Sequence, residues 1–126
     1  FALQVGGDTS VNEWWLDSGC SQHMTCLKGD FVHYEKLATP IDVVLADKSV
    51  VPAVGSGDVN IIIFNNEEDV PVVFKNVLYV PRLKKRLLSI SEMTKTGAEI
   101  KFKGDLCTLL INQKNYVIGH KHGKLC

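Results

Sequence analysis

Short runs of β-branched and other apolar residues, separated by turn-forming residues, dominate the chain. The apolar run Trp14–Leu16 leads into Asp17 and predicts a strand that stops at Ser18-Gly19. Residues 41–54 predict a long hairpin whose turn lies at Asp47-Lys48-Ser49. A Gly-Ser-Gly group at 55–57 predicts a break, after which a new strand runs to about Phe64.

The remaining segments predict further strands and one helix. Residues 20–37 are polar and irregular, which indicates a surface loop with Phe31, Val32 and Tyr34 turned inward. Residues 72–80 predict a strand that ends before Pro81. In residues 98–119 apolar and polar residues alternate again, which predicts strands with turns at Gly104-Asp105 and near 112–115. A helical stripe ends at Gly97 and consists of Leu87, Leu88, Ile90 and Met93. Six to eight short strands and one helix indicate an all-β domain.

The size and the net charge of the chain limit the classes of function that we expect for it. A chain of 126 residues with 45% hydrophobic residues has the size of one domain with its own core, so we expect a single domain over 1–126. Fourteen basic residues balance fourteen acidic ones, so neither nucleic acid nor an anionic membrane is an expected partner. No apolar run reaches the roughly 18 residues of a membrane span, and no signal peptide is visible. The first residue is Phe1 rather than Met, which indicates a processed or excised chain.

The segment WWLDSGCSQHMTC (residues 14–26) suggests two different chemistries. The first is a zinc site, because Cys20, His23 and Cys26 stand three residues apart and a fourth ligand could come from a C-terminal group. That group contains His120, His122 and Cys126. The spacing C-x2-H-x2-C matches no common zinc module, so a zinc-dependent nucleic-acid-binding module is the weaker alternative.

The second chemistry is hydrolysis by a pair of carboxylates. Two aspartates that share one proton can activate water and protonate a peptide carbonyl oxygen, without a metal or other cofactor. Asp17-Ser18-Gly19 suits this chemistry, because the glycine permits a tight turn and the hydroxyl can hydrogen-bond across the site. Asp and Gly also occur in ordinary turns, so the tripeptide alone is a weak signal.

Four segments together resemble the copia-type retrotransposon aspartic proteases, which are relatives of the retropepsins. The segments are WWLDSGCSQHMT, VVLADKSVVPAVGSGDV, FKNVLYVPRLKKRLLSISEMTKTGAEIKF and DLCTLLI, in this order. The resemblance implies a retropepsin-like closed β-barrel or sandwich with one short helix, which forms half of a two-fold symmetric protease. Residues 112–126 resemble the start of the connection toward integrase in such polyproteins.

The resemblance also implies roles for individual residues. Asp17 would be the catalytic aspartate, Ser18 the hydroxyl that grips the partner subunit's loop, and Gly19 the turn glycine. Ser21 would supply an extra hydroxyl near the carboxylate. The flap that closes over the substrate would consist of Leu45, Ala46, Asp47, Lys48 and Ser49.

Two positions depart from the pattern of this family. Cys20 stands where the family usually has Ala, which suggests that oxidation of the thiol could silence the enzyme. Arg86 stands where Asn usually precedes Leu-Leu-Ser, and nothing in the sequence accounts for that change.

The chain contains one Asp-Ser-Gly, whereas the mechanism needs two aspartates. We therefore expect a homodimer in which two Asp17 side chains meet across a two-fold axis, with residues 1–5 and 115–119 as candidate interface strands. The expected substrate is a Gag-Pol-type precursor that contains the protease itself, cleaved in the cytoplasm within virus-like particles. The rivals are a domesticated domain that keeps the fold without cleaving, and the zinc module described above.

Overall fold

The computed structural model describes residues 2–3, 14–17, 19–64, 69–95, 97–103, 106–111 and 114–120. Within these ranges the chain forms ten strands, one short α-helix and one 3-10 turn, so the predicted mostly-β domain with one helix is confirmed. The strand count exceeds the expected six to eight. The first elements are β1 (Ala2–Leu3), β2 (Trp14–Asp17), β3 (Met24–Thr25), η1 (Lys28–Asp30), β4 (Phe31–Val44) and β5 (Val50–Phe64). They are followed by β6 (Asp69–Tyr79), β7 (Arg86–Ser89), α1 (Ile90–Lys95), β8 (Glu99–Lys103), β9 (Leu106–Ile111) and β10 (Lys114–His120).

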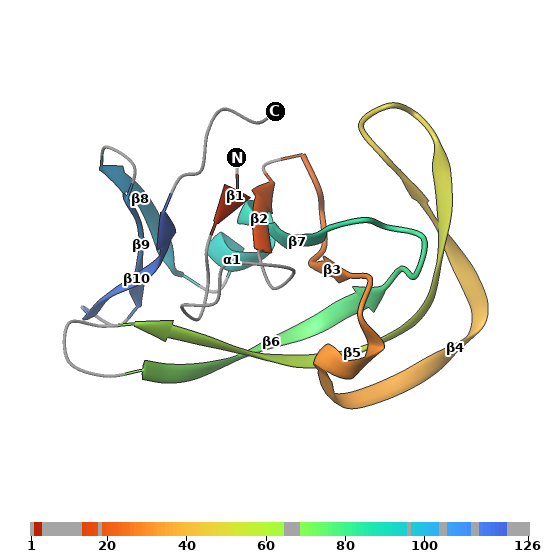
Figure 1. Cartoon of the computed structure of the whole chain (residues 1–126), viewed down its shortest axis with the longest axis horizontal. Coiled ribbons are helices and arrows are strands. Elements are labelled where there is room, and N and C mark those ends of the chain that lie inside the picture. The colour runs from red at the N-terminus through yellow and green to blue at the C-terminus, as the bar shows by residue number, and fades with distance from the viewer. Residues whose placement is uncertain are drawn as a thin grey trace.

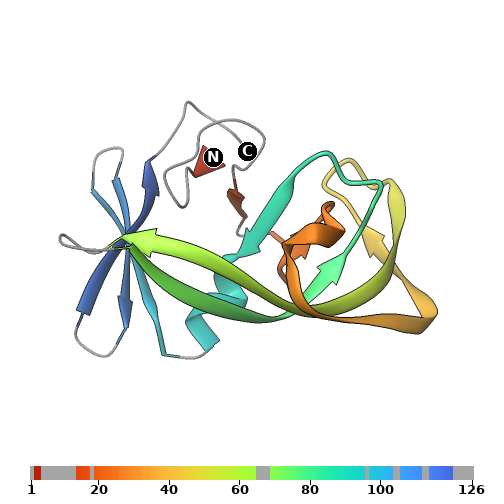
Figure 2. The ribbon, with the colours of Figure 1, turned by 60° about the horizontal axis from the view of Figure 1, so that its bottom comes forward.

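One sheet contains all ten strands (Figure 1). Its order is β1-β2-β7-β3-β6-β5-β10-β9-β8, and β4 also pairs with β5. Figure 2 shows the long β5–β6 pair running through the molecule, with β8–β10 at one end and the β4–β5 hairpin at the other. Because β1 and β8 lie at the two ends of the strand order in the described chain, the expected closed barrel is not seen. No helix among the described residues is long and apolar enough to cross a membrane.

The hairpin between β4 and β5 has its turn where the sequence predicted it. Val44 pairs with Val50, and between them Leu45 N–H donates to the Ser49 carbonyl at 2.8 Å. Asp47 Oδ1 accepts the Ser49 N–H at 2.9 Å, and Lys48 takes a left-handed φ of 68°. A local aspartate bond of this kind is typical of a tight polar turn.

The predicted break at Gly55-Ser56-Gly57 is wrong, because β5 continues through all three residues. The two glycines instead allow β4 to approach closely. A Cβ on Gly55 would overlap the ring of Tyr34, and a Cβ on Gly57 would overlap the His33 carbonyl oxygen. Glycine within a strand often marks such a close approach rather than a chain break.

The predicted loop over 20–37 is shorter than expected, because β4 begins at Phe31. Phe31 and Tyr34 are half-buried and form edge-to-face contacts with each other and with Tyr79. Val32 was expected inside but is 49% exposed. Val32 lies at an irregularity of β4, where the register against β5 shifts between Phe31 and His33.

The predicted helix begins later than its apolar stripe suggested. Arg86–Ser89 form β7, and α1 starts at Ile90, so Leu87 and Leu88 belong to a strand. Pairing with β2, in which Leu88 lies beside Leu16, overrides the helical spacing of these leucines. The predicted stop is confirmed, since Gly97 adopts a left-handed φ of 87° just after the helix.

The two terminal strands differ from each other in their pairing. β1 pairs only with β2 among the described strands and lies at one end of the sheet order. β10 lies between β5 and β9, so the segment 115–119 is not an unpaired edge as we had expected. The turns expected at Gly104-Asp105 and near 112–115 fall largely outside the described residues.

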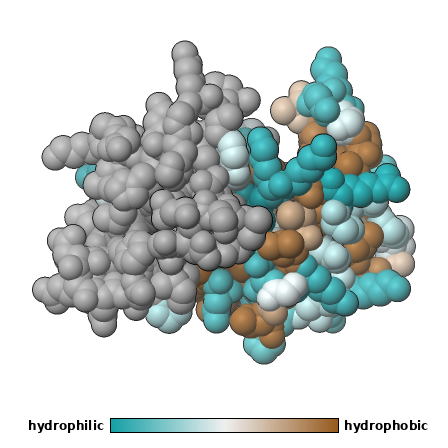
Figure 3. Space-filling view, viewed as in Figure 1, coloured by the Kyte–Doolittle hydropathy of each residue, from teal (hydrophilic) through white to brown (hydrophobic). Residues whose placement is uncertain are grey.

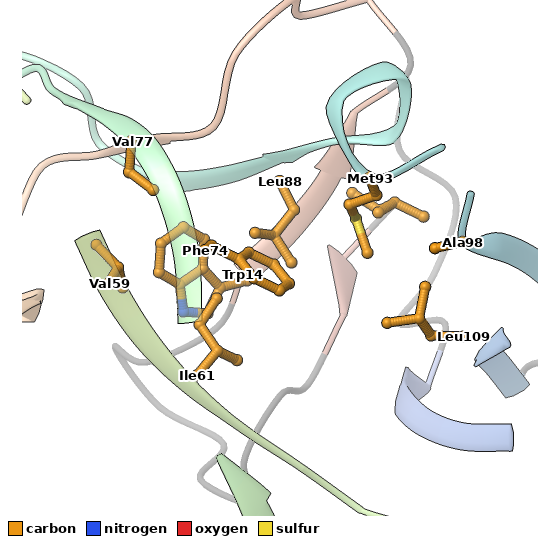
Figure 4. Packing of buried hydrophobic residues seen from close by; sticks show 10 residues of the cluster. Trp14, Val59, Ile61, Phe74, Val77, Leu88, Met93, Ala98 and Leu109 are labelled. Atoms are coloured by element: carbon orange, nitrogen blue, oxygen red, sulfur yellow. The ribbon is translucent and has the colours of Figure 1, made fainter. Parts of the chain in front are cut away.

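Two apolar clusters hold the sheet together. The larger one fills the space between β2, β5, β6, β7 and α1 (Figure 4). Trp14 is 3% exposed at its centre, whereas Trp15 is half-buried and carries Lys85 Nζ at 4.0 Å from its ring centroid. The two side chains therefore differ in burial as expected for neighbours on a strand, whose side chains point to opposite faces. The smaller cluster includes residues of the β4–β5 hairpin and contains Met24, Val43, Ala53, Leu78 and Val80.

Arg86 is buried, and it forms an ion pair and an aromatic contact. Its Nη1 lies 3.0 Å from Asp30 Oδ1 and 3.1 Å from Oδ2, and its guanidinium carbon lies 4.7 Å from the Trp14 ring centroid. Asp30 Oδ2 also accepts the Thr25 hydroxyl at 2.6 Å. The Arg86 side chain is 8% exposed, so a residue that the sequence left unexplained ties β7 to η1 and to β2.

We predict that Asp30→Asn destabilises the domain by about 3 kcal/mol, because it leaves the buried Arg86 charge without its counter-ion. The double variant Asp30→Asn/Arg86→Met should lose less free energy of unfolding than Asp30→Asn alone. Lys95→Met is the matched control, since it removes the ion pair of an exposed lysine with Glu92 and should cost under about 1 kcal/mol. Urea unfolding of the four proteins measures these values, and a double variant that loses as much free energy of unfolding as Asp30→Asn, or more, would contradict the coupling.

Candidate active site

Asp17 is the last residue of β2, and β2 pairs in parallel with β7. The register places Asp17 beside Ser89, the last residue of β7. Buried side chains support this pair from both strands, since Trp14, Leu16 and Leu88 are all at most 3% exposed. The sequence Trp-Trp-Leu-Asp thus anchors one end of the strand in the core and presents a carboxylate at the other.

The Asp17 carboxylate is held by the turn that follows it. Asp17 is half-buried, and its Oδ1 accepts the Gly19 N–H at 2.7 Å. A Cβ on residue 19 would lie 3.2 Å from the same oxygen, so a larger residue would crowd the carboxylate. Glycine at this position therefore has a packing reason, since its φ is not in the left-handed region that favours glycine.

The other predicted loop residues have different surroundings. Ser18 lies outside the described residues. Ser21 is exposed, and Cys20 is half-buried against the smaller apolar cluster. The Cys20 backbone carbonyl accepts the Ser89 hydroxyl at 2.7 Å, which ties the loop to β7.

The Cys20 thiol is poorly suited to act as a redox switch. Burial, reinforced by the nearby Asp17 charge, raises the pKa of the thiol to about 12. Thiolate is the form that reacts with oxidants, so this thiol is almost entirely in its unreactive form at neutral pH. The structure therefore argues against the oxidation hypothesis.

His23 is a buried histidine with a satisfied hydrogen bond. It is 5% exposed, its Nδ1 accepts the Ser89 N–H at 2.9 Å, and its backbone carbonyl accepts the Leu78 N–H at 2.9 Å. Its ring stacks on Phe74 with centroids 4.9 Å apart and an interplanar angle of 26°. Burial lowers the pKa of this imidazole to about 4, partly offset by the Glu92 charge.

These surroundings do not favour the zinc alternative. Among the described residues, no group of three or more His, Cys, Asp or Glu side chains could hold a metal ion. Nδ1 of His23 already accepts a backbone N–H, and burial raises the pKa of both the Cys20 and Cys26 thiols, although zinc binds thiolate. The side chains of the C-terminal candidates, His120, His122 and Cys126, lie outside the description.

The β4–β5 hairpin, which the sequence predicted as a flap, has a mostly polar tip and apolar arms. Ala46, Asp47, Lys48 and Ser49 are exposed, whereas Leu45 is half-buried against the smaller cluster. Next to the tip, Val44 is 69% exposed and its partner Val50 is 52% exposed. In Figure 3 the polar tip stands at the upper right, with brown apolar surface directly below it.

Sequence reasoning missed Ser89, which connects the loop to α1. It is fully buried; its hydroxyl donates to the Cys20 carbonyl and accepts the Glu92 N–H at 3.2 Å. This makes Ser89 the N-cap of α1, with Glu92 at the third helical position. The motif Ser-Ile-Ser-Glu at 89–92 is a capping-box pattern and could have placed the helix start correctly.

We predict that Cys20 reacts with iodoacetamide at pH 7.5 at least ~100-fold more slowly in the folded protein than in urea, because burial suppresses its thiolate. Peptide mass spectrometry over time gives the rate for this residue. Modification at the same rate in both states would contradict the burial argument.

We predict that His23 makes stability depend on pH. The unfolded imidazole, with a pKa of 6.5, binds a proton more readily than the folded one, with a pKa of about 4. The free energy of unfolding is therefore highest above pH 6.5 and falls by about 3 kcal/mol as the pH drops to 4. Urea unfolding at pH 7.5 and pH 4 should show a smaller loss in His23→Asn than in wild type, and equal losses would contradict the assignment.

Comparisons with known proteins agree with this architecture. The sequence is 29% identical over 101 residues to the retrovirus-related Pol polyprotein from transposon RE1 of Arabidopsis thaliana, covering 79% of the chain. It is also 29% identical over 95 residues, or 75% of the chain, to the corresponding polyprotein from transposon RE2 of the same plant. The chain spans only 7% and 6% of the length of these two relatives.

The sequence also matches the protein family described as Pol polyprotein, beta-barrel domain. The match covers residues 14–98, which include β2, the β4–β5 hairpin, β6, β7 and α1. This range is well over half of the 126 residues, and it contains Asp17, His23, Arg86 and Ser89. The chain therefore belongs to the Pol polyprotein beta-barrel domain family and is a relative of retrotransposon Pol polyproteins.

Proposed function

We propose that this domain is half of an aspartic endopeptidase of a retrotransposon, active as a homodimer. The observation that carries the proposal is the Asp17 carboxylate, half-buried at the end of a core strand and fixed by the Gly19 N–H at 2.7 Å. A rigidly held acid on a supporting strand is what general acid–base chemistry requires. Membership in the Pol polyprotein beta-barrel domain family and the similarity to retrovirus-related Pol polyproteins of transposons support the retrotransposon origin of the proposed enzyme.

The proposed mechanism requires two copies of the chain. Asp17 of each copy meets its symmetry mate, and the two carboxylates share one proton because two negative charges about 3 Å apart repel each other. The ionised carboxylate takes a proton from water as the water attacks the peptide carbonyl. The protonated carboxylate donates its proton to the carbonyl oxygen, and the tetrahedral intermediate then breaks to release the amine. Ser18 is proposed to bridge the two loops across the axis.

The flap supplies a surface for an extended peptide. Val44 and Val50 lie opposite each other on the hairpin arms and expose apolar side chains, which would lose contact with water if a peptide or a second subunit covered them. The polar tip, Ala46 to Ser49, can remain solvated during closure. We propose that the hairpin closes over the substrate and binds its backbone in strand-like fashion.

The proposed substrate is the Pol-type precursor from which the domain derives. The chain spans 6–7% of the polyproteins it matches, so cleavage of flanking segments would release it as a separate unit. We propose that this processing takes place in the cytoplasm within virus-like particles. The proposal involves neither a metal nor a nucleotide, and neither nucleic acid nor a membrane as a partner.

We predict that Asp17→Asn leaves the fold intact and lowers precursor cleavage by at least ~10³-fold, because the water loses its base. The matched control is Asp58→Asn, which removes a carboxylate from the middle of β5 and should cleave as wild type does. A precursor assay followed by gel electrophoresis measures both variants. Substantial cleavage by Asp17→Asn would refute the mechanism, and a wild-type chain that cleaves nothing would favour a domesticated domain.

A further inference from the structure

Ser89 forms hydrogen bonds to both ends of the loop that follows Asp17. Its hydroxyl donates to the Cys20 carbonyl at 2.7 Å, and its backbone N–H donates to His23 Nδ1 at 2.9 Å. Because Ser89 is also the register partner of Asp17, one residue of β7 fixes the catalytic strand and the loop together. The loop therefore cannot shift relative to β7 without breaking one of these contacts.

The bond to His23 replaces half of an ordinary capping box. In that motif the side chain at the third helical position accepts the backbone N–H of the N-cap residue. Here the N-cap residue is Ser89, and its N–H bonds the imidazole instead, while the Glu92 carboxylate accepts Lys95 Nζ at 2.9 Å. The Ser89 N–H would bond Glu92 within the helix in an ordinary capping box. Here it bonds His23 and so connects the start of α1 to the loop that follows Asp17.

His23 is itself held rigidly. Stacking on Phe74 fixes its ring, and the bond from Leu78 N–H to its carbonyl fixes its backbone against β6. Because the ring stacks on Phe74 and accepts the Ser89 N–H, the imidazole fixes the loop relative to both β6 and β7. A residue that keeps an acceptor at this position but lacks the ring would keep the hydrogen bond and lose the stacking on Phe74.

We propose that His23 is a positioning residue for the Asp17 carboxylate, acting through the Ser89 N–H that its Nδ1 accepts. The inference rests on the proposed function, because it concerns how the catalytic loop is held. His23 does not touch the reacting atoms in this account. It keeps residues 20–23 in the arrangement that lets the Gly19 N–H reach Asp17 Oδ1.

The proposal requires the tautomer that carries its proton on Nε2, because only an unprotonated Nδ1 can accept an N–H. Three elements place ionisable groups around this ring. Glu92 of α1 and Lys75 of β6 line a cavity of about 410 Å³ together with His23, whereas the Cys20 thiol of the same loop does not line it. The negative charge of Glu92 favours a proton on the ring, whereas burial opposes it.

Two substitutions at His23 test separately the hydrogen-bond acceptor and the ring. His23→Asn keeps an oxygen where Nδ1 stands, while His23→Leu fills similar space without an acceptor. We expect His23→Leu to lower kcat roughly tenfold or more with KM within about twofold, because a misplaced carboxylate affects the transition state more than binding. His23→Asn should recover most of kcat. The matched control is His33→Asn on the exposed face of β4, which should cleave like wild type.

A second measurement does not depend on proteolysis. Long-range proton–nitrogen NMR spectra of wild type should show His23 with its proton on Nε2. Hydrogen exchange at the Ser89 amide should be slow in wild type and in His23→Asn. In His23→Leu the same amide should exchange at least ~10-fold faster. A proton on Nδ1, unchanged exchange in His23→Leu, or equal kcat in all variants would overturn the inference. If Asp17→Asn cleaves normally while the exchange results hold, the proposed function fails but the link from His23 to Ser89 stands.

Discussion

Four residues of β2 pair in parallel with four residues of β7, and this short ladder determines where Asp17 lies. At one end of the ladder Trp14 lies beside Arg86, whose guanidinium stacks on the indole and pairs with Asp30. At the other end Asp17 lies beside Ser89. A buried charge pair thus fixes the ladder where the core is deepest, and neutral hydrogen bonds fix it where the carboxylate meets solvent. Loss of either support would leave the acid on an unsupported turn.

The ion pair and the uncharged hydrogen bonds each fit the end of the β2–β7 ladder at which they lie. A charged pair can be buried at the Arg86 end because Asp30, Thr25 and the Trp14 ring surround it. A cation beside Asp17 would instead stabilise the ionised carboxylate and so oppose the proton that the proposed mechanism shares between two carboxylates. Around Asp17 the bonds come from a backbone N–H, a serine hydroxyl and a neutral imidazole, which restrain the loop without adding a positive charge. Burial keeps the His23 pKa low and the Cys20 pKa high, so both side chains remain neutral near pH 7.

Local sequence signals predicted those parts of the fold that depend on local chemistry. The hairpin turn at Asp47–Ser49, the strand into Asp17 and the helix stop at Gly97 follow from turn residues and apolar runs. Long-range pairing decided the features that the sequence did not predict. Leu87 and Leu88 have helical spacing but form a strand because β2 pairs with them, and Gly55 and Gly57 look like a break but make room for β4. Arg86 and Ser89 could not be assigned from the sequence because their partners, Asp30, Cys20 and His23, are more than fifty residues away.

The central claim is that one chain supplies one acid and that two chains are needed for cleavage. Mixing wild-type and Asp17→Asn subunits at a fixed total concentration tests this directly, since heterodimers carry a single Asp17 carboxylate. If two aspartates are required, activity follows the square of the wild-type fraction, so an equal mixture retains about one quarter of the full rate. A rate that falls in simple proportion to the wild-type fraction would mean that each chain cleaves independently, and would contradict the account.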